Sequence, residues 1–136
     1  MGGERQIVGL GGGGDTPEQS LALTRHVLAL TGKERPRVLY VPTAVGDAAE
    51  GIVGFYERCA GLGELSHVCF FPWPPADLRE LALAQDAICV SGGSTANMLA
   101  IWRVHGFDVI MREAWESWVV LAGSSAGMIC WFDAPA

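Results

Sequence analysis

The sequence predicts an α/β fold, in which a doubly wound, mostly parallel sheet carries helices on both faces. Short runs rich in Val, Ile and Leu alternate with segments of helical periodicity along the chain of 136 residues. The runs are apolar at most positions, which is typical of strands that a parallel sheet buries on both faces. A glycine or proline follows each run directly, where the chain must turn away from the sheet. We therefore expect one α/β domain over residues 1–136.

The predicted strands combine β-branched and other apolar residues with a breaker at the next position: residues 6–10, 37–41, 64–71, 87–91 and 118–122. The predicted helices lie between them: residues 17–31, 47–61, 76–85, 94 or 95 to 105, and 108–115. Pro17 suits the first turn of a helix, and Gly32 ends the apolar stripe that follows it. The proline pair after Trp73 breaks the chain before the third helix, and Gly92 and Gly93 turn it into the fourth.

Composition excludes several classes of protein. Half of the residues are apolar and 18% are charged, which indicates a globular chain. A net charge of −6 without a Lys/Arg cluster argues against a nucleic-acid partner. The longest apolar runs are too short to span a bilayer, and the N-terminus lacks the pattern of a secretory signal. The four cysteines form no CxxC pair, so we expect reduced thiols in a cytoplasmic protein without metal or other cofactor.

The first glycine-rich turn, Gly9 to Gly14, matches the dinucleotide fingerprint G-x-G-x-x-G. The fingerprint also expects an acidic residue about 20 residues later, at the end of the second strand, to hold the ribose. That strand ends in Val41-Pro42-Thr43, without a carboxylate. Nucleotide binding and a tight turn of purely structural importance both remain open for this segment.

The second glycine-rich turn, Ser91-Gly92-Gly93-Ser94-Thr95, leads from a strand directly into a helix. Backbone N–H groups at such a turn are unpaired and suit an anion or a developing oxyanion. The alternative is that Ser94 or Thr95 only caps the helix. The two roles are compatible, so this turn alone does not define a function.

The third glycine-rich turn contains Ser125 at the centre of Gly123-Ser124-Ser125-Ala126-Gly127, the G-x-S-x-G pattern of a nucleophile elbow. A sharp turn from strand to helix exposes the serine hydroxyl, and small neighbours relieve the crowding. The N–H of Ala126 would then point to the space where a tetrahedral oxyanion forms. The alternative is a helix start made of small residues and capped by a serine.

Four stretches, in order along the chain, resemble the peptidase E (dipeptidase E) family S51 of serine peptidases: GLGGGGD, RVLYVPTAVGD, VSGGSTANMLAIWRVHGFDVIMREAW and VVLAGSSAGMICWF. The resemblance implies a fold like that of class I glutamine amidotransferases. It also implies that Ser125 is the nucleophile, that the N–H groups of Gly93 and Ala126 form the oxyanion hole, and that the substrate is a short peptide, as in the Asp-X dipeptidases. The substrate pocket would contain Gly92, Ser94 and Thr95.

The chain departs from the family in two ways. Ser94 stands where the family has Asn, which weakens the expectation of aspartyl specificity. The family's catalytic His and its carboxylate partner lie beyond the elbow helix, so the chain resembles an N-terminal portion. None of His26, His67 and His105 is expected near Ser125. A non-catalytic α/β binding or interaction domain is therefore the alternative function.

The missing segment also leads to an expectation about association. Trp131 and Phe132 follow the elbow and would lie near the end of the chain. Each aromatic side chain has about 150–250 Å² of surface to bury. We therefore expect a homo-oligomer, or pairing with a C-terminal fragment, through the surface near residues 128–136.

Overall fold

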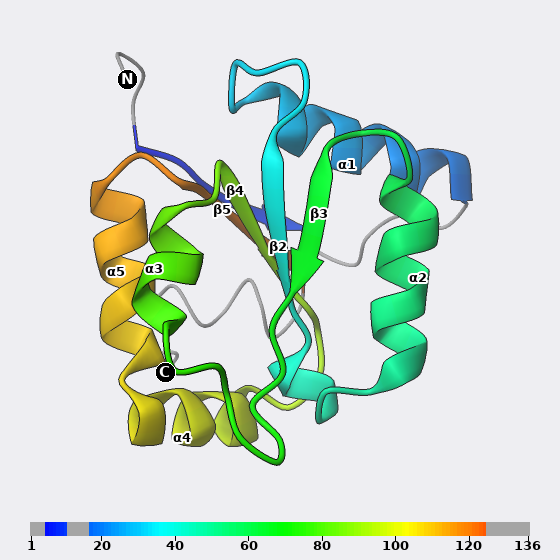
Figure 1. Cartoon of the computed structure of the whole chain (residues 1–136). Helices are drawn as coiled ribbons and strands as arrows, with labels where there is room; N and C mark the ends of the chain where they lie inside the picture. The colour runs from blue at the N-terminus through cyan, green and yellow to red at the C-terminus, as the bar shows by residue number, and fades with distance from the viewer. Residues whose placement is uncertain (1–4, 11–16, 125–136) are drawn as a thin grey trace.

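The computed structural model describes residues 5–10 and 17–124 of the chain, and its elements carry the labels of Figure 1. The strands are β1 (Ile7–Leu10), β2 (Arg37–Val41), β3 (Glu64–His67), β4 (Ala87–Val90) and β5 (Val120–Ser124). The helices are α1 (Pro17–Ala29), the 3-10 helix η1 (Thr43–Val45), α2 (Ala49–Cys59), α3 (Leu78–Leu83), α4 (Thr95–His105) and α5 (Phe107–Glu116).

The strands form one sheet in the order β1-β5-β4-β2-β3, and every neighbouring pair is parallel. The chain passes from β2 outward to β3, then returns to the other side of β2 for β4 and continues outward to β5. The winding direction therefore changes between β2 and β4. In doubly wound sheets, ligands bind beyond the carboxyl ends of the strands at such a point.

Two separate hydrophobic cores cover the two faces of the sheet. Alternate residues of the central strands, such as Leu39 and Ile88, pack against α3, α4 and α5. The residues between them, such as Val38 and Ala87, pack against α1 and α2. Figure 1 shows the same division, with α1 and α2 on one side of the sheet and the other three α-helices on the opposite side. The predicted doubly wound α/β fold is confirmed.

The third strand is shorter than predicted. The sequence favoured residues 64–71, but β3 ends at His67. The carboxylate of Asp47 accepts hydrogen bonds from the backbone N–H groups of Phe70 at 2.8 Å and Phe71 at 3.0 Å. These N–H groups are therefore bound by a side chain, and the apolar pattern of the segment reflects burial of Phe70 in the core.

The fifth strand begins later than predicted and extends further. Trp118 has a φ of 68°, and the N–H of Val119 donates to the carbonyl of Ala114, so these residues end α5. The strand covers Val120–Ser124 in place of the predicted residues 118–122. As a result, Ser125 follows the last residue of β5 directly.

The helix predicted over residues 47–61 is α2, which covers Ala49–Cys59 and is preceded by the separate short helix η1. Asp47 has a φ of 59°, which interrupts the chain between η1 and α2. The short helix η1 was not predicted from the sequence. The remaining helices match their predicted positions within three residues. None of the described helices has both the length and the apolar character needed to cross a membrane.

Candidate functional site

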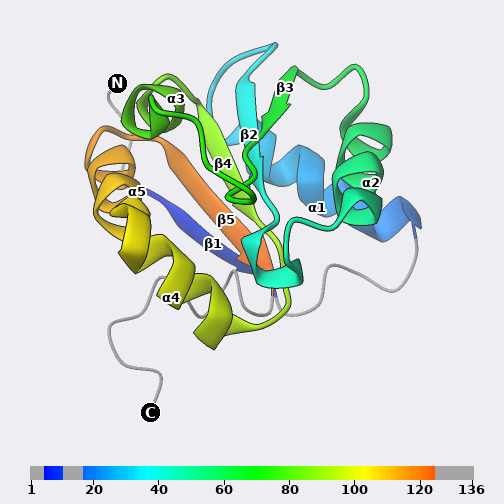
Figure 2. The same ribbon diagram turned by 60° about the horizontal axis from the view of Figure 1, so that its bottom comes forward.

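The carboxyl ends of β4 and β5 bring two of the predicted turns to the same edge of the sheet. Val90 is paired with Gly123 in the ladder between these strands. The glycine turn, here defined as residues 91–94, therefore leaves the sheet beside the end of β5. Figure 2 shows this carboxyl edge, with η1 next to the connection from β4 to α4.

The glycine turn has a backbone conformation that only glycine fits. Gly93 has a φ of 138°, and a Cβ atom at this position would lie 2.2 Å from the carbonyl oxygen of Ala44. The N–H of Ser94 donates to the same carbonyl at 2.8 Å, and the N–H of Ser91 donates to the carbonyl of Val41 at 3.1 Å. The turn is thus fixed to η1 and to the end of β2.

The N–H group of Gly93 is available to a ligand. Among the described residues, the N–H groups of Gly92 and Gly93 donate no hydrogen bond. The N–H of Ser94 is already bound by Ala44. The N–H of Gly93 is therefore free to donate a hydrogen bond, whereas the N–H of Ser94 is not. An oxyanion hole requires such a free donor.

Ser94 is also the N-cap of α4, which begins at Thr95. Its hydroxyl accepts a hydrogen bond from the N–H of Asn97 at 3.3 Å. The capping role that the sequence left as an alternative is therefore present, and it coexists with the free N–H of Gly93. The hydroxyl of Ser94 keeps one proton to donate to a substrate.

Buried hydroxyl and thiol groups lie on the α1 and α2 side of the glycine turn. Ser91 is 8% exposed, and its Oγ has no hydrogen-bond partner among the described residues. Burial raises the pKa of Tyr40, opposed by the charge of Arg58 and by the Ser91 hydroxyl, which lies near Tyr40 without meeting hydrogen-bond geometry. Burial also raises the pKa of Cys89 to about 12. Cys89 is therefore a neutral thiol at neutral pH and is not a nucleophile for this site.

Two of the three histidines, His67 and His105, lie away from the end of β5. His67 ends the edge strand β3, three strand spacings or roughly 14 Å from β5. The Nδ1 atom of its ring forms a hydrogen bond with the hydroxyl of Tyr56 at 2.8 Å. His105 ends the 11-residue helix α4, about 16 Å along the helix from the glycine turn. His26 is exposed on α1. Ser125 lies outside the described residues, so the expectation that none of these histidines serves it stays a prediction.

Several predicted site residues lie outside the described part of the chain. They are Ser125 and Ala126 at the elbow, Gly11 to Gly14 in the first glycine run, and Trp131 and Phe132 near the end. Conversely, two contributors to the glycine turn were not predicted from the sequence. The backbone carbonyl of Ala44 accepts the N–H of Ser94, and Thr43 is the residue before Ala44 in η1. Because every residue has a backbone carbonyl, this contact cannot be recognised from the residue type.

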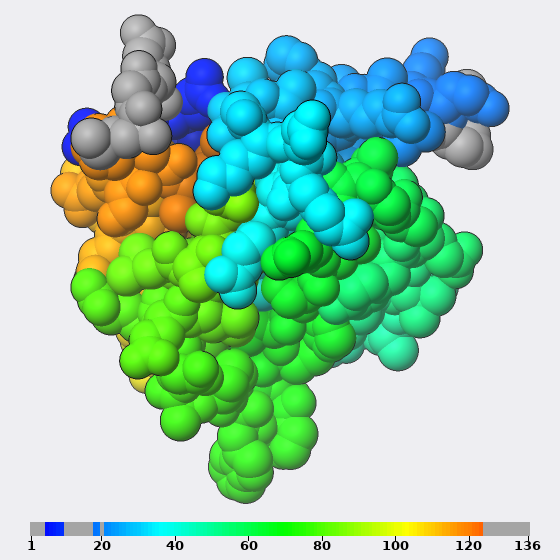
Figure 3. Space-filling view, turned by 45° about the horizontal axis from the view of Figure 1, so that its top comes forward, coloured from blue at the N-terminus to red at the C-terminus, as the bar shows by residue number. Residues whose placement is uncertain are grey.

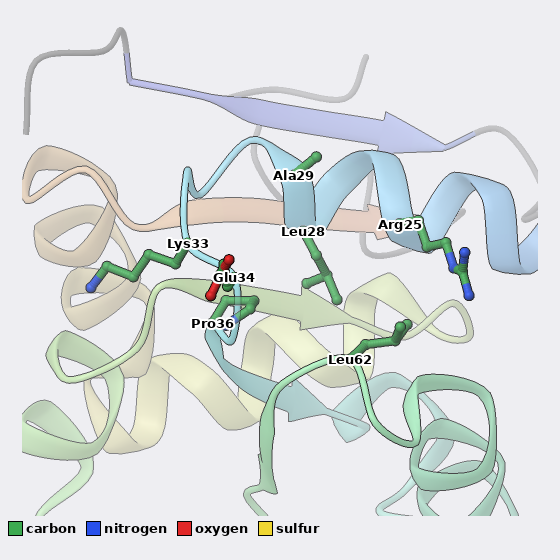
Figure 4. Close-up of a pocket in the computed structure, with 7 residues that line it drawn as sticks. All are labelled: Arg25, Leu28, Ala29, Lys33, Glu34, Pro36 and Leu62. Carbon is green, nitrogen blue, oxygen red and sulfur yellow. The ribbon is translucent and has the colours of Figure 1, made fainter.

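A pocket of about 390 Å³ lies at the opposite, amino edge of the sheet, between α1 and the segments before β2 and β3. Figure 4 shows Leu28 pointing from α1 into the space between Pro36 and Leu62. This pocket is remote from the glycine turn. Within residues 5–10 and 17–124, no three His, Cys, Asp or Glu side chains are gathered as a metal site would require.

Comparisons with known proteins agree with the resemblance. A family model described as peptidase family S51 matches residues 7–135. A protein of Bacillus subtilis (strain 168), named uncharacterized peptidase YgaJ, is 42% identical over 131 residues. The matched region makes up 95% of this chain and 57% of the Bacillus protein. The chain thus spans little more than half the length of this relative.

Two solved structures share the fold. A peptidase E protein from Listeria monocytogenes EGD-e superposes with a TM-score of 0.70 at 19% identity, and the match covers 92% of this chain and 60% of that one. A peptidase from an acI-B1 Actinobacterium superposes with a TM-score of 0.63 at 22% identity, over 89% of this chain and 54% of that one. Both known chains therefore extend well beyond the matched region.

Proposed function

The chain belongs to peptidase family S51, and from this membership we propose that it is the nucleophile-bearing part of a serine peptidase of the peptidase E type. Ser125 is the proposed nucleophile, and the N–H groups of Gly93 and Ala126 are the proposed oxyanion hole. The observation that carries the proposal is the free N–H of Gly93 on a turn that leaves the sheet beside the end of β5. An oxyanion donor and a serine that follows a strand are two of the parts that an acyl-transfer site needs, together with a general base.

The proposed reaction proceeds in two acyl-transfer steps. The hydroxyl oxygen of Ser125 forms a bond to the scissile carbonyl carbon while its proton passes to a general base. The carbonyl oxygen becomes an oxyanion that accepts hydrogen bonds from Gly93 and Ala126. When this intermediate collapses, the C–N bond breaks and the amine leaves with the proton. Water then attacks the acyl-enzyme by the same route and releases the second product.

The base is proposed to come from outside the 136 residues, through a second copy or a C-terminal fragment. The positions of His26, His67 and His105 support this, as does the greater length of the Bacillus relative. β1 lies at the edge of the sheet, and no described strand pairs with its outer side. Ile7 on this strand is 42% exposed. An open sheet edge favours association.

Light scattering at micromolar concentration tests the association. The proposal predicts a mass well above 14.5 kDa, or formation of a complex with a C-terminal fragment. A clean monomer with cooperative unfolding would contradict it.

The proposed substrate is a short peptide held by Gly92, Ser94 and Thr95. Asp-X dipeptides are the first candidates, but the Ser94 hydroxyl already accepts from Asn97 and is shorter than an amide. We propose a cytoplasmic setting for the reaction. The described cysteines, Cys59, Cys69 and Cys89, are free thiols, as is usual in reducing compartments.

Peptide hydrolysis by a pair of adjacent serine variants tests the function. Ser125→Ala should abolish hydrolysis of short peptides. Ser124→Ala, one residue earlier in the same turn, should retain it and serves as the matched control. Equal activity of both variants would exclude Ser125 as the nucleophile.

The alternative is an α/β domain that binds small peptides or acidic amino acids without turnover. The distance of His67 and His105 from the end of β5 favours it. Calorimetry with a short peptide separates the two functions. Binding without hydrolysis supports the alternative, and hydrolysis that depends on Ser125 excludes it.

A further inference from the structure

A short backbone segment from a different part of the chain supports the glycine turn. η1 follows β2, some 50 residues before the turn. Its central residue, Ala44, contributes the carbonyl that accepts the N–H of Ser94 at 2.8 Å. The same carbonyl lies against Gly93, where a Cβ atom would be 2.2 Å from it. The position of Ala44 therefore determines both which N–H group is occupied and where the neighbouring free N–H lies.

The residue before Ala44, Thr43, is held by a buried hydrogen bond. The indole Nε1–H of Trp102 donates to the hydroxyl of Thr43 at 3.0 Å. Trp102 is 1% exposed and Thr43 is 2% exposed. The indole ring also packs edge-on against Phe107, with the ring centroids 5.3 Å apart. This packing fixes the direction of the indole N–H.

These contacts form a closed circuit. The glycine turn leads into α4, and Trp102 lies two turns along that helix. The Trp102 side chain reaches back to Thr43, the chain continues to Ala44, and the Ala44 carbonyl returns to Ser94. A displacement of Thr43 must therefore move the carbonyl at the point where it contacts the turn. Within a packed interior such a displacement is resisted by every member of the circuit.

We propose that Thr43 is a positioning residue for the oxyanion hole. Its hydroxyl, held by Trp102, places the Ala44 carbonyl so that the N–H of Ser94 is occupied and the N–H of Gly93 is left to the substrate. Thr43 touches neither the substrate nor the reacting atoms. The inference rests on the proposed function for its catalytic consequence, whereas its structural part stands on the contacts alone.

Amide hydrogen exchange in the whole chain tests the structural part. Thr43→Val keeps the shape of the side chain and removes the hydroxyl. We expect the Ser94 amide to exchange about tenfold faster in this variant, as a weakened hydrogen bond would allow. Thr43→Ser restores the hydroxyl and should return exchange to the original rate. The Ser91 amide, which donates to Val41, provides an internal control in the same spectra.

The control decides between a local and a general effect. Faster exchange at Ser94 with unchanged exchange at Ser91 supports positioning by Thr43. An equal increase at both amides in Thr43→Val, or no increase at Ser94, would overturn the proposal. If Thr43→Val fails to fold, Trp102→Phe removes the indole donor from the other side, and the same comparison of Ser94 with Ser91 applies.

Labelling of Ser125 by a fluorophosphonate tests the catalytic part. Misplacement of a donor by a fraction of an ångström should lower the labelling rate of Thr43→Val by about tenfold and leave Thr43→Ser near the original rate. Unchanged labelling of Thr43→Val would overturn the link to the oxyanion hole while the proposed function stands. If the original chain is not labelled even in the assembly that supplies the base, the proposed function fails, and the exchange result alone decides the structural part.

Discussion

At the amino edge of the sheet, the Asp86 carboxylate accepts the N–H of Arg37 at 2.8 Å and pairs with the Lys33 ammonium at 2.8 Å. At the carboxyl edge, the N–H of Gly93, Oδ1 of Asp47 and Oγ of Ser91 have no partner among the described residues. Among buried side-chain atoms alone, the amino edge has one without a partner, Oε1 of Gln85, whose amide nitrogen is bonded to the carbonyl of Leu81.

The difference indicates what each edge does. Buried polar groups in folded proteins are normally paired, so the two buried atoms without a partner at the carboxyl edge mark a place for a ligand or for further chain, next to the exposed N–H of Gly93. The pocket described above also lies at the amino edge, between α1 and the segment before β2. Figure 3, which faces this edge, shows the segment that follows α1, in cyan, lying over the strands. We interpret the amino edge as structural and the carboxyl edge as functional.

The loop after β3 adds an apolar feature to the carboxyl edge. It projects from the rest of the molecule, as Figures 1 and 3 show. Trp73 in this loop is 82% exposed, and Phe71 is 59% exposed. The base of the loop is firm, because Asp47 binds two of its N–H groups and Phe70 is buried against Phe107.

The largest expected effect compares one glycine from each edge. A Cβ atom at Gly93 would lie 2.2 Å from the carbonyl oxygen of Ala44, and one at Gly63 would lie 2.3 Å from that of Pro36. Gly93→Ala and Gly63→Ala should therefore each lower the free energy of unfolding, by about 2–4 kcal/mol. Only Gly93→Ala should also lower Ser125 labelling, by roughly 100-fold or more, because it displaces the oxyanion donor.

Urea denaturation and labelling of the two variants check this prediction. Gly54→Ala is the control for the substitution itself. Gly54 lies in α2, and a Cβ atom there would have no neighbour from outside the helix within 4 Å. This change should therefore stabilise the helix by about 0.5–1 kcal/mol. Equal loss of labelling in Gly93→Ala and Gly63→Ala would remove the distinction between the edges.

The next effect concerns the base of the projecting loop. Asp47→Ala removes the acceptor for the N–H groups of Phe70 and Phe71 and places alanine at a φ of 59°. We expect a loss of about 2 kcal/mol in the free energy of unfolding. Asp47→Asn keeps an acceptor and tolerates the backbone conformation, so its loss should be smaller. Thermal unfolding of both variants gives the comparison, and equal losses would contradict the proposed role of the side-chain oxygen.

A smaller, pH-dependent effect is expected at the amino edge. Partial burial acts to raise the pKa of Asp86, but the N–H of Arg37 and the charge of Lys33 outweigh it and lower that pKa. Asp86 therefore stabilises the fold above its unfolded pKa, and this contribution is lost as pH falls through the lower, folded pKa. Because Lys33 is 61% exposed, Asp86→Asn should cost only about 1 kcal/mol at pH 7.

Denaturation of Asp86→Asn and the original chain at several pH values measures this difference. The gap between the two curves should be constant from neutral pH to about pH 5 and should close in more acidic solution. A gap that widens as the pH falls would show the opposite sign and contradict the assignment.

The smallest effect is expected where β1 meets α5. The Arg5 guanidinium lies 4.7 Å from the ring centroid of Trp118, and its Nε donates to the carbonyl of Glu116. Arg5→Ala should lower the free energy of unfolding by about 0.5–1 kcal/mol. Arg5→Lys keeps the cation and should lose less. Urea denaturation measures the free energies of unfolding of both variants. A loss in Arg5→Ala greater than that in Asp47→Ala would contradict the expected order of the effects.

The sequence predicted the fold class and all five described strands because their apolar runs and breakers are local signals. It misplaced β5, since Trp118 and Val119 are as apolar as strand residues although they end α5. It did not predict where β3 ends, because the N–H groups that follow the strand are bound by the carboxylate of Asp47, which is distant in sequence.

The same distinction applies to the candidate site. The glycine turn was predicted from Gly92 and Gly93, whose lack of a side chain is visible in the sequence. The occupation of the Ser94 N–H by the Ala44 carbonyl was not, because any residue at position 44 has a carbonyl. The contact between Thr43 and Trp102 likewise depends on how α4 packs against η1.

The most direct test of the central claim, that the carboxyl edge carries a serine nucleophile beside an oxyanion donor, is fluorophosphonate labelling followed by mass spectrometry of the peptides. The account predicts a single labelled residue, Ser125, with the label lost in Gly93→Ala and retained in Gly63→Ala. A folded chain that takes up no label when assembled with the second copy or C-terminal fragment that supplies the base, or that is labelled at another residue, would contradict this claim.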